Sequence, residues 1–426
     1  MSQIPHKEDQ DKPNLSWSLN QWLEYLLSIH TQSIDMGLER TKGVFDTLKI
    51  HFGQAKVVLV AGTNGKGTTC RVVEKGLLQN NKTVAVYSSP HITDFKERLR
   101  INDNLLSDEQ FISAFMQVEK ARGDTPLTYF EFTTLAAMYL MMNNQTDFVL
   151  LEVGLGGRLD AVNVVNPDMA VITSIGLDHQ DWLGDTRDQI AIEKAGVFRP
   201  HLPVIIGEQD PPQSLINEVD RLAAQATWQG RDFTFQADQN SWHWHNTNCD
   251  FDELVTPMIP MQNVSTGLEV LHRLGIDLNQ HKVNQLIQQT SLPGRFERVL
   301  SQPEVILDVA HNPQATSHLK ERINQCQFKQ LRLVLAMLAD KDISASIAPL
   351  EALNATWYLA SLTVPRGASS KKLKSLFNDD QKVIDFETVS DALNRAIKEA
   401  DPQDLIVVFG SFFTVCQAKE ALTHLR

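Results

Sequence analysis

Cysteine is scarce in this sequence, and its cysteines are scattered. Four occur among 426 residues, at positions 70, 249, 326 and 416. Their spacing contains no Cys-x-x-Cys pair that could bind zinc and no dense framework of disulfides. We therefore expect four reduced thiols and a cytoplasmic protein.

Long apolar runs are also missing. The longest apolar stretches, such as residues 135–142, fall well short of the roughly 18 residues that suggest a membrane-spanning helix. Residues 1–13 are polar and carry Asp and Glu, without the basic start and apolar stretch of a signal peptide. The sequence therefore predicts neither export nor a membrane partner.

Basic residues are outnumbered by acidic ones. The chain has 39 Lys and Arg against 52 Asp and Glu, which gives a formal charge of -13. Binding to nucleic acid or anionic lipid without sequence preference rewards an excess of positive charge, so we expect no nucleic-acid partner. With 42% hydrophobic and 21% charged residues, the composition is that of a globular protein, and the length favours more than one domain.

Short β-rich runs alternate with segments of helical length and pattern. In the first part of the chain these runs are 56–61, 83–87, 147–153, 169–174 and 203–207. The alternation restarts at 304–309 and continues through 331–337, 356–360, 382–386 and 405–410. Such alternation predicts an α/β protein with a doubly wound, mainly parallel sheet and a second, smaller Rossmann-like α/β domain.

A Pro-Gly turn marks the expected boundary between the two domains. It lies in residues 291–295 (SLPGR), after a helical pattern at 281–289. We place the first domain at 1–293 and the C-terminal domain at 294–426. Residues 228–260 show little periodicity. We expect irregular strands and loops there, at the edge of the first domain, and assign them no chemistry.

A glycine-rich segment follows the run at 56–61 and precedes a helical pattern at 70–79. It consists of Gly62, Thr63, Asn64, Gly65, Lys66, Gly67, Thr68 and Thr69. Glycines let backbone N–H groups converge on phosphate oxygens, the following helix presents its positive end, and Lys66 supplies a mobile charge. The spacing is shorter than that of the common phosphate loop, because Gly67 separates Lys66 from Thr68. The segment predicts a P-loop, and the alternative is a glycine-rich turn with an exposed lysine.

At these residues the chain resembles the Mur ligase superfamily and, within it, the family of folylpolyglutamate and dihydrofolate synthases. Further motifs follow in the order of that family. They are 34–40 (IDMGLER), 87–91 (YSSPH), 151–160 (LEVGLGGRLD), 193–196 (EKAG), 292–296 (LPGRF) and 308–313 (DVAHNP). The resemblance extends from about residue 19 to the C-terminus.

The resemblance implies two magnesium ions held beside ATP. Residues matching Ser89 and Glu152 hold the first ion in the family, and Glu152, His179 and a carbamylated Lys194 serve the second. Lys66, Lys194 and His179 are the expected catalytic residues. Taken singly, Ser89 fits a turn before a proline, His179 a loop histidine and Lys194 a solvated helix lysine. Magnesium prefers oxygen ligands, which makes His179 an unusual one.

The resemblance also assigns residues to ATP and to L-glutamate. The expected ATP-binding residues are the P-loop residues 62–68 together with Asn263, Arg295 and Asp308. His311 and Ser411 match positions that bind the incoming L-glutamate. The alternatives are a linker arginine paired with a surface carboxylate for Arg295 and a turn residue at a strand end for Asp308.

A third set matches segments that surround the pterin substrate in bifunctional bacterial members. It consists of Ser33, Ile34, Asp35, Met36, Thr128, Tyr129, Phe130, Glu131, Leu159, Asp160 and Ala161. An aromatic pair beside a carboxylate could stack a flat heterocycle and accept its N–H bonds. Equally, Tyr129 and Phe130 fit a core at the start of a helix.

The implied activity is an ATP-dependent ligase that joins L-glutamate to dihydropteroate and to tetrahydrofolate through an acyl phosphate, and a monomer is expected. An enzyme restricted to polyglutamylation is one alternative. A cell-wall Mur ligase is another, although the segment before the P-loop is short for a UDP-binding domain. The others are a nucleotide-dependent switch and a binding protein that has lost catalysis.

Overall fold

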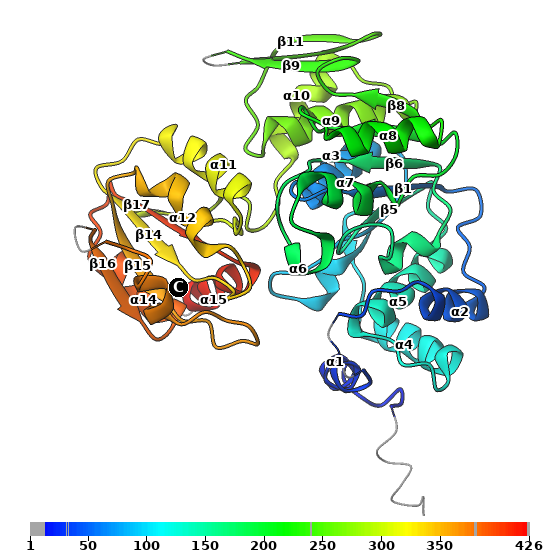
Figure 1. The fold of residues 1–426 in the computed structure, drawn as a ribbon, viewed down its shortest axis with the longest axis horizontal. Coiled ribbons are helices and arrows are strands. Elements are labelled where there is room, and N and C mark those ends of the chain that lie inside the picture. The colour runs from blue at the N-terminus through cyan, green and yellow to red at the C-terminus, as the bar shows by residue number, and fades with distance from the viewer. Residues whose placement is uncertain (1–12, 31, 33, 239–240, 379–380, 424–426) are drawn as a thin grey trace, which may run out of the picture.

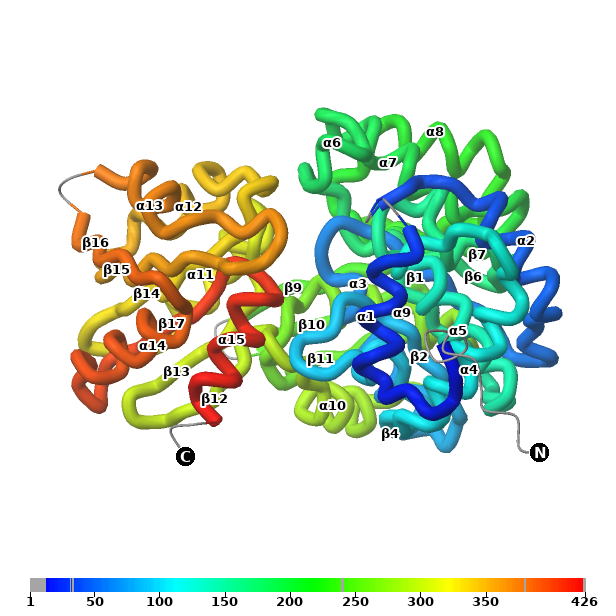
Figure 2. The backbone as a smooth tube through the Cα atoms, turned by 90° about the horizontal axis from the view of Figure 1, so that it is seen from below, coloured from blue at the N-terminus to red at the C-terminus, as the bar shows by residue number. Residues whose placement is uncertain are grey.

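The computed structural model describes residues 13–30, 32, 34–238, 241–378 and 381–423. The chain forms two bodies, a larger one that ends with α10 and a smaller one that begins with β12 (Figure 1). The perpendicular view in Figure 2 shows the same division.

The larger body is built on an eight-stranded sheet with the order β4-β3-β2-β5-β1-β6-β7-β8. The six strands from β2 to β8 in this order are parallel, and β3 and β4 extend one edge as antiparallel strands. The strands are β1 (Lys56–Ala61), β2 (Val84–Tyr87), β3 (Leu99–Ile101), β4 (Asn104–Leu105), β5 (Phe148–Glu152), β6 (Met169–Ile172), β7 (Pro203–Ile206) and β8 (Gln225–Trp228).

Helices cover both faces of this sheet. Strand β1 sends Leu59 and Ala61 into one apolar core and Val58 and Val60 into another, because successive side chains point to opposite faces. The helices are α1 (Leu19–Ser28), α2 (Glu39–Leu48), α3 (Lys66–Gln79), α4 (Asp108–Arg122), α5 (Tyr129–Asn144), α6 (Gln180–Leu183), α7 (Arg187–Ala195), α8 (Gln213–Arg221), α9 (Met261–Arg273) and α10 (Gln280–Gln289), with 3-10 turns at Phe95–Arg98 and Ala161–Val164.

Residues 228–260 contain the strands that the sequence predicts there, paired in a three-stranded antiparallel sheet whose register shifts between Trp242 and Trp244. Its strands are β9 (Phe233–Ala237), β10 (Trp242–Asn246) and β11 (Asp250–Leu254). Trp242 and Trp244 alternate with histidines along β10 and are fully buried. The indole N–H of Trp244 donates to Ser265 Oγ of α9 at 3.0 Å. The sheet therefore covers α9, as Figure 1 shows.

The smaller body contains a six-stranded sheet with the order β12-β13-β17-β14-β15-β16, parallel except for β12. Its strands are β12 (Glu297–Ser301), β13 (Glu304–Leu307), β14 (Leu331–Leu335), β15 (Ala355–Ala360), β16 (Val383–Phe386) and β17 (Leu405–Phe409). Its helices are α11 (Pro313–Asn324), α12 (Ile343–Glu351), α13 (Ser370–Lys374), α14 (Val389–Lys398) and α15 (Phe412–Thr423). The expected fold class, two α/β sheets of unequal size, is confirmed.

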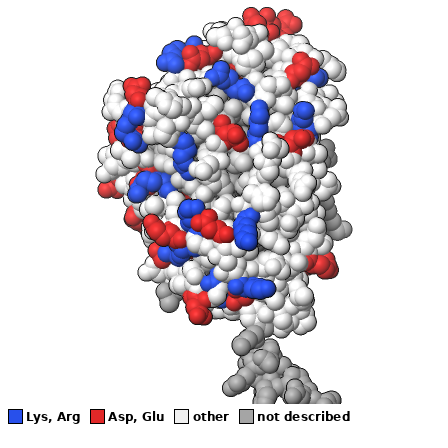
Figure 3. Space-filling view, turned by 90° about the vertical axis from the view of Figure 1, so that its right-hand side faces the viewer, with Lys and Arg blue, Asp and Glu red and all other residues white. Residues whose placement is uncertain are grey.

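Two surface properties bear on partners. Within the described part of the chain, none of the helices combines the length and the apolar character that a membrane crossing requires. On the face shown in Figure 3, acidic and basic side chains are interspersed, whereas a nucleic-acid-binding surface gathers Lys and Arg in one stripe.

Candidate active site between the two sheets

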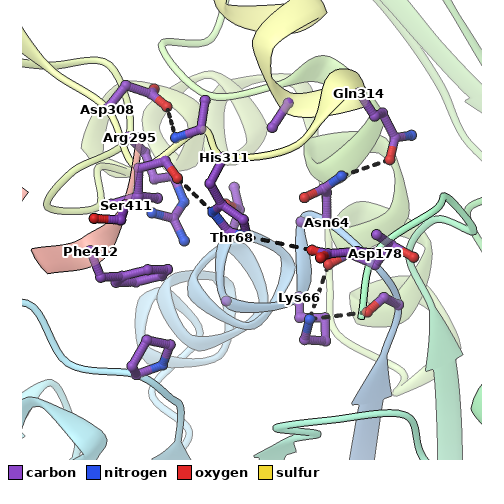
Figure 4. A pocket seen from close by; sticks show the side chains of 18 of the residues that line it. Asn64, Lys66, Thr68, Asp178, Arg295, Asp308, His311, Gln314, Ser411 and Phe412 are labelled. Carbon is purple, nitrogen blue, oxygen red and sulfur yellow. Dashed lines mark hydrogen bonds and ion pairs between the residues drawn. The ribbon is translucent and has the colours of Figure 1, made fainter. Parts of the chain in front are cut away.

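A cavity of about 590 Å³ lies between the two bodies (Figure 4). It is lined by the P-loop and by loops that follow strands of both sheets. Every residue predicted to bind ATP, metal or glutamate lines it: Gly62, Thr63, Asn64, Gly65, Lys66, Gly67, Thr68, Ser89, Glu152, His179, Lys194, Asn263, Arg295, Asp308, His311 and Ser411. The structure thus brings these sets together, while their individual roles stay predictions.

The P-loop wraps around the side chain of Lys66. The Lys66 ammonium donates to the carbonyl oxygens of Gly62 and Thr63 at 3.0 and 3.1 Å. Gly65 has a φ of 84°, and a Cβ atom there would lie 2.2 Å from Asn263 Oδ1, so glycine permits the contact with α9. Burial lowers the pKa of Lys66, and the charge of Glu152 opposes that shift.

Ser89 and Glu152 offer hard oxygen ligands beside the P-loop. Glu152 ends β5, and its Oε2 accepts the backbone N–H of Ser89 at 3.3 Å. A Cβ atom on Gly67 would lie 3.3 Å from the same oxygen, so the carboxylate contacts the start of α3. Burial raises the pKa of Glu152, whereas Lys66 lowers it. This oxygen set fits a magnesium ion that also contacts nucleotide phosphates.

The predicted second metal site depends on a modification of Lys194. The Lys194 ammonium is buried and donates to the carbonyl oxygen of Gly62 at 3.0 Å. Burial and the charge of Lys66 lower its pKa to about 7. Among the described residues, no three His, Cys, Asp or Glu side chains converge to hold a metal ion. The unmodified residues therefore do not fit a second ion, and a carbamate on Lys194 would add the missing oxygens.

In the second body, the Asp308 side chain fixes the segment at Phe296 to the loop that follows β13. Its two carboxylate oxygens accept the backbone N–H groups of Phe296 and Ala310, each at 2.8 Å. Arg295 directly precedes Phe296, and its guanidinium lies 5.0 Å from the ring centre of Phe412. Burial lowers the pKa of Arg295, while the carboxylate of Asp308 raises it. This surface offers an aromatic ring and a cation to the cavity.

Hydrogen bonds join the two bodies across the cavity. Asn64 and Asn312 exchange side-chain amide bonds at 3.1 and 3.0 Å, and Asn64 also donates to Gln314 at 2.7 Å (Figure 4). Lys341 donates to Asp178 at 2.5 Å, and His311 lies 3.5 Å from the same carboxylate.

Burial would raise the pKa of Asp178, but the hydrogen bond to His311 and the charge of Lys341 hold it well below its usual range. The sequence analysis missed Asp178, Asn312, Gln314 and Lys341. Asn312 lies within the quoted motif at 308–313, and Asp178 directly precedes His179.

The predicted folate residues lie behind the cavity wall and do not line it. Ser33 falls outside the described residues. Phe130 and Met36 approach Gly154 and Gly156, whose added Cβ atoms would lie 2.5 Å from the Phe130 ring and 3.7 Å from the Met36 methyl group. Both glycines line the cavity.

Two carboxylates of this set are already hydrogen-bonded within the protein. Glu131 accepts bonds from Arg40, Thr41 and the backbone of Thr128. Asp160 accepts the N–H groups of Leu155 and Val162, and burial raises its pKa to about 6. The folate-binding role of the set stays a prediction.

Known proteins are similar to this chain in both sequence and fold. The Mur ligase middle domain matches residues 60–268, and the Mur ligase glutamate ligase domain matches residues 294–412. The dihydrofolate synthase/folylpolyglutamate synthase of Escherichia coli is 39% identical over 97% of this chain and 98% of that protein. The chain belongs to the Mur ligase family, in its dihydrofolate synthase/folylpolyglutamate synthase branch.

Solved structures of this branch superpose on nearly the full length of the chain. Escherichia coli FolC in complex with DHPP and ADP has a TM-score of 0.93 at 39% identity and covers 97% of this chain and 100% of that chain. A bifunctional folylpolyglutamate synthase/dihydrofolate synthase with Mn, AMPPNP and L-glutamate bound has a TM-score of 0.90 at 44% identity, covering 96% and 99%. As a Mur ligase, the chain is a carbon–nitrogen ligase.

Proposed function

We propose that this chain adds L-glutamate to dihydropteroate, forming dihydrofolate, and to tetrahydrofolate, forming folylpolyglutamates, with ATP as substrate and magnesium as cofactor. The observation that carries the proposal is the single cavity in which the P-loop and Glu152 face the loops at His311 and Ser411. The relatives bind DHPP, ADP, Mn, AMPPNP and L-glutamate, which are the ligands or analogues that this reaction requires.

The reaction has two steps. An oxygen of the substrate carboxylate attacks the γ-phosphorus of ATP, the bond to the bridging oxygen breaks, and an acyl phosphate and ADP result. The neutral amine nitrogen of glutamate then attacks the acyl carbon, phosphate leaves, and the nitrogen loses one proton and keeps the other as the N–H of the new amide. Such chemistry asks the protein for positioning and charge rather than for a nucleophile.

The P-loop binds the phosphates of ATP in this proposal. Its N–H groups and the ammonium of Lys66 face the negative charge that develops during transfer. An ion held by Ser89 and Glu152 would neutralise further charge on the phosphates. Asn263, Arg295 and Asp308 bind the remainder of the nucleotide.

The other substrates approach from two sides of the cavity. His311 and Ser411 bind the incoming glutamate from the second body. The folate residues bind the pterin beyond Gly154 and Gly156. Because both bodies contribute to one cavity, their closure keeps water away from the acyl phosphate. His179 and a carbamylated Lys194 complete the metal site on the P-loop side.

Three finer features are part of the same proposal. Apolar cores on either side of the linker, with Ile92 alone packing into a core of the other side, support domains at 1–293 and 294–426. Four cysteines without disulfides support the cytoplasm as compartment.

We also propose a monomer, because one chain supplies the whole cavity. Sedimentation of the purified protein would test the monomer, since a dimer doubles the measured mass.

The test is to incubate the protein with ATP, magnesium, L-glutamate and either dihydropteroate or tetrahydrofolate, and to follow ADP release and product mass. We expect a gain of one glutamyl unit on dihydropteroate and of one or more on tetrahydrofolate, and neither with a Lys66→Met control. Gain on tetrahydrofolate alone would restrict the enzyme to polyglutamylation. ADP release without an amide product would contradict the ligase and favour a nucleotide-dependent switch.

A further inference from the structure

Glu74 is a buried carboxylate that the proposed reaction does not use. It lies on α3, the helix that follows the P-loop, and its side chain is fully buried. It accepts a two-pronged ion pair from Arg100, with Nε at 3.1 Å and Nη2 at 2.9 Å. Arg71 Nη1 donates to the same carboxylate at 3.0 Å. A charge is held in such a place only when its partners are well oriented.

Arg100 extends this contact to the loop that follows β2. The pairing of β2 with β3 places Arg100 opposite Val86, near the end of β2. Its remaining group, Nη1, donates to Ser88 Oγ and to the carbonyl oxygen of Glu97, each at 3.2 Å. One guanidinium therefore joins the P-loop helix to the residue that directly precedes Ser89.

We propose that Glu74 and Arg100 are positioning residues for the divalent cation that binds with ATP. The pair fixes the 88–90 loop against α3, and this sets the separation between Ser89, Glu152 and the P-loop. The inference rests on the proposed metal and nucleotide site. It adds two residues that touch neither the metal nor the substrates.

The chemistry of the arginine side chain suits this role. Its planar fork binds Glu74 on one edge and still directs Nη1 at Ser88, whereas a lysine has one ammonium and cannot span both. Ser88 is the weak end of the connection, because its side chain contributes a single hydroxyl to it. Removing that hydroxyl leaves the bonds from Arg100 to Glu74 and to Glu97 in place.

The test measures cation binding directly. Free Mn²⁺ is followed by electron paramagnetic resonance while it is titrated into protein saturated with a non-hydrolysable ATP analogue. We expect Ser88→Ala and Arg100→Lys to weaken Mn²⁺ binding about tenfold, the lower end of the effect typical of residues behind metal ligands. Binding of the analogue without metal should stay as in the wild type, and Ser88→Ala should keep the wild-type melting temperature.

A buried arginine–carboxylate pair elsewhere is the control. Arg332 donates to Asp404 at 3.0 Å within the smaller body, and both side chains are buried. Arg332→Lys should lower the melting temperature without changing Mn²⁺ affinity. If folded Ser88→Ala binds Mn²⁺ as tightly as the wild type, the pair is structural only and the inference is overturned, whether or not Arg100→Lys folds. If the wild type itself binds no Mn²⁺ with the analogue, the proposed metal site fails as well.

Discussion

Lys194 occupies a position where a permanent positive charge is unfavourable. It lies in the last turn of α7, buried, and its ammonium contacts the carbonyl oxygen of Gly62 in the P-loop. Burial and the neighbouring charge of Lys66 lower its pKa to about 7. Reaction of the neutral amine with carbon dioxide would replace a cation by an anion and turn repulsion from Lys66 into attraction. The environment therefore favours a carbamate.

The first prediction concerns this modification. A lysine with a pKa of about 7, lowered from 10.5, is mostly protonated at about pH 6 and mostly neutral at about pH 8. Only the neutral amine reacts, so the carbamate should form as the pH rises through 7 and be lost as it falls. We expect a carbamate signal in ¹³C NMR with labelled bicarbonate at about pH 8, weakened severalfold at about pH 6.

Two variants make this measurement specific. Lys194→Met should lose the signal and Lys341→Met, which removes another lysine of the cavity, should keep it. The carbamate assignment would be wrong if Lys194→Met still showed the signal, or if the wild type lacked it at about pH 8.

At the scale of elements, the N-terminus of α5 is held by a capping box formed by Thr128 and Glu131. Thr128 Oγ1 accepts the N–H of Glu131 at 3.2 Å, and Glu131 Oε2 accepts the N–H of Thr128 at 2.8 Å. The same carboxylate accepts bonds from Arg40 and Thr41 of α2 at 3.0 and 2.9 Å. One side chain thus caps α5 and ties it to α2, which stabilises the wall behind the cavity.

The second prediction is that Glu131→Gln lowers the free energy of unfolding by about 3 kcal/mol, because it leaves Arg40 without its buried partner. Urea denaturation measures this loss. The control is Gln110→Ala in the capping box of α4, which is exposed and should lose less than about 1 kcal/mol. Wild-type stability combined with a higher KM for dihydropteroate would instead assign Glu131 to substrate contact.

At the same scale, the sequence predicts the buried parallel strands better than the edges. The runs at 56–61 and 304–309 have apolar cores at 57–61 and 305–307, as expected of strands covered on both faces, and they contain β1 and β13. Strands β3, β4, β8 and β12 were missed, since short or half-exposed strands at or near an edge carry little apolar signal. In β10 the alternation of Trp and His was present, but we expected irregular structure there.

The residues of the candidate site also differ in how well the sequence predicts them. The P-loop and Glu152 follow directly from strand ends, because the ends of parallel strands meet at one edge of a sheet. The sequence analysis assigned Glu131 to the folate set and did not foresee that it also caps α5. Nor could it find Lys341 and Gln314, which meet Asp178 and Asn64 only because two separate sheets face each other.

On the scale of the whole molecule, polar contacts around the cavity are among those that join the two bodies. The P-loop residue Asn64 bonds to Asn312 and Gln314, and Asp178 bonds to Lys341. The P-loop is thereby connected to the second body. Within the larger body, Thr63 ties the P-loop to Gly176. The Thr63 hydroxyl donates to the carbonyl oxygen of Gly176 at 3.0 Å and accepts the N–H of Gly176 at 2.9 Å.

The last prediction tests that connection. The pair of Asp178 and Lys341 is short, at 2.5 Å, and the two side chains are only 9% and 10% exposed. Removing one partner of such a pair weakens the closed arrangement by about 3 kcal/mol, or roughly a hundredfold in the closed-to-open ratio. Lys341→Met without ligands should therefore show a larger radius of gyration in small-angle X-ray scattering.

The matched control is Lys329→Met. Lys329 pairs with Asp401 at 2.6 Å within the smaller body, and the two side chains are 56% and 59% exposed. This variant should scatter as the wild type does. Identical scattering by all three proteins would mean that the other contacts between the two bodies, such as those of Asn64 and of Arg322 with Pro257, hold them together without the ion pair.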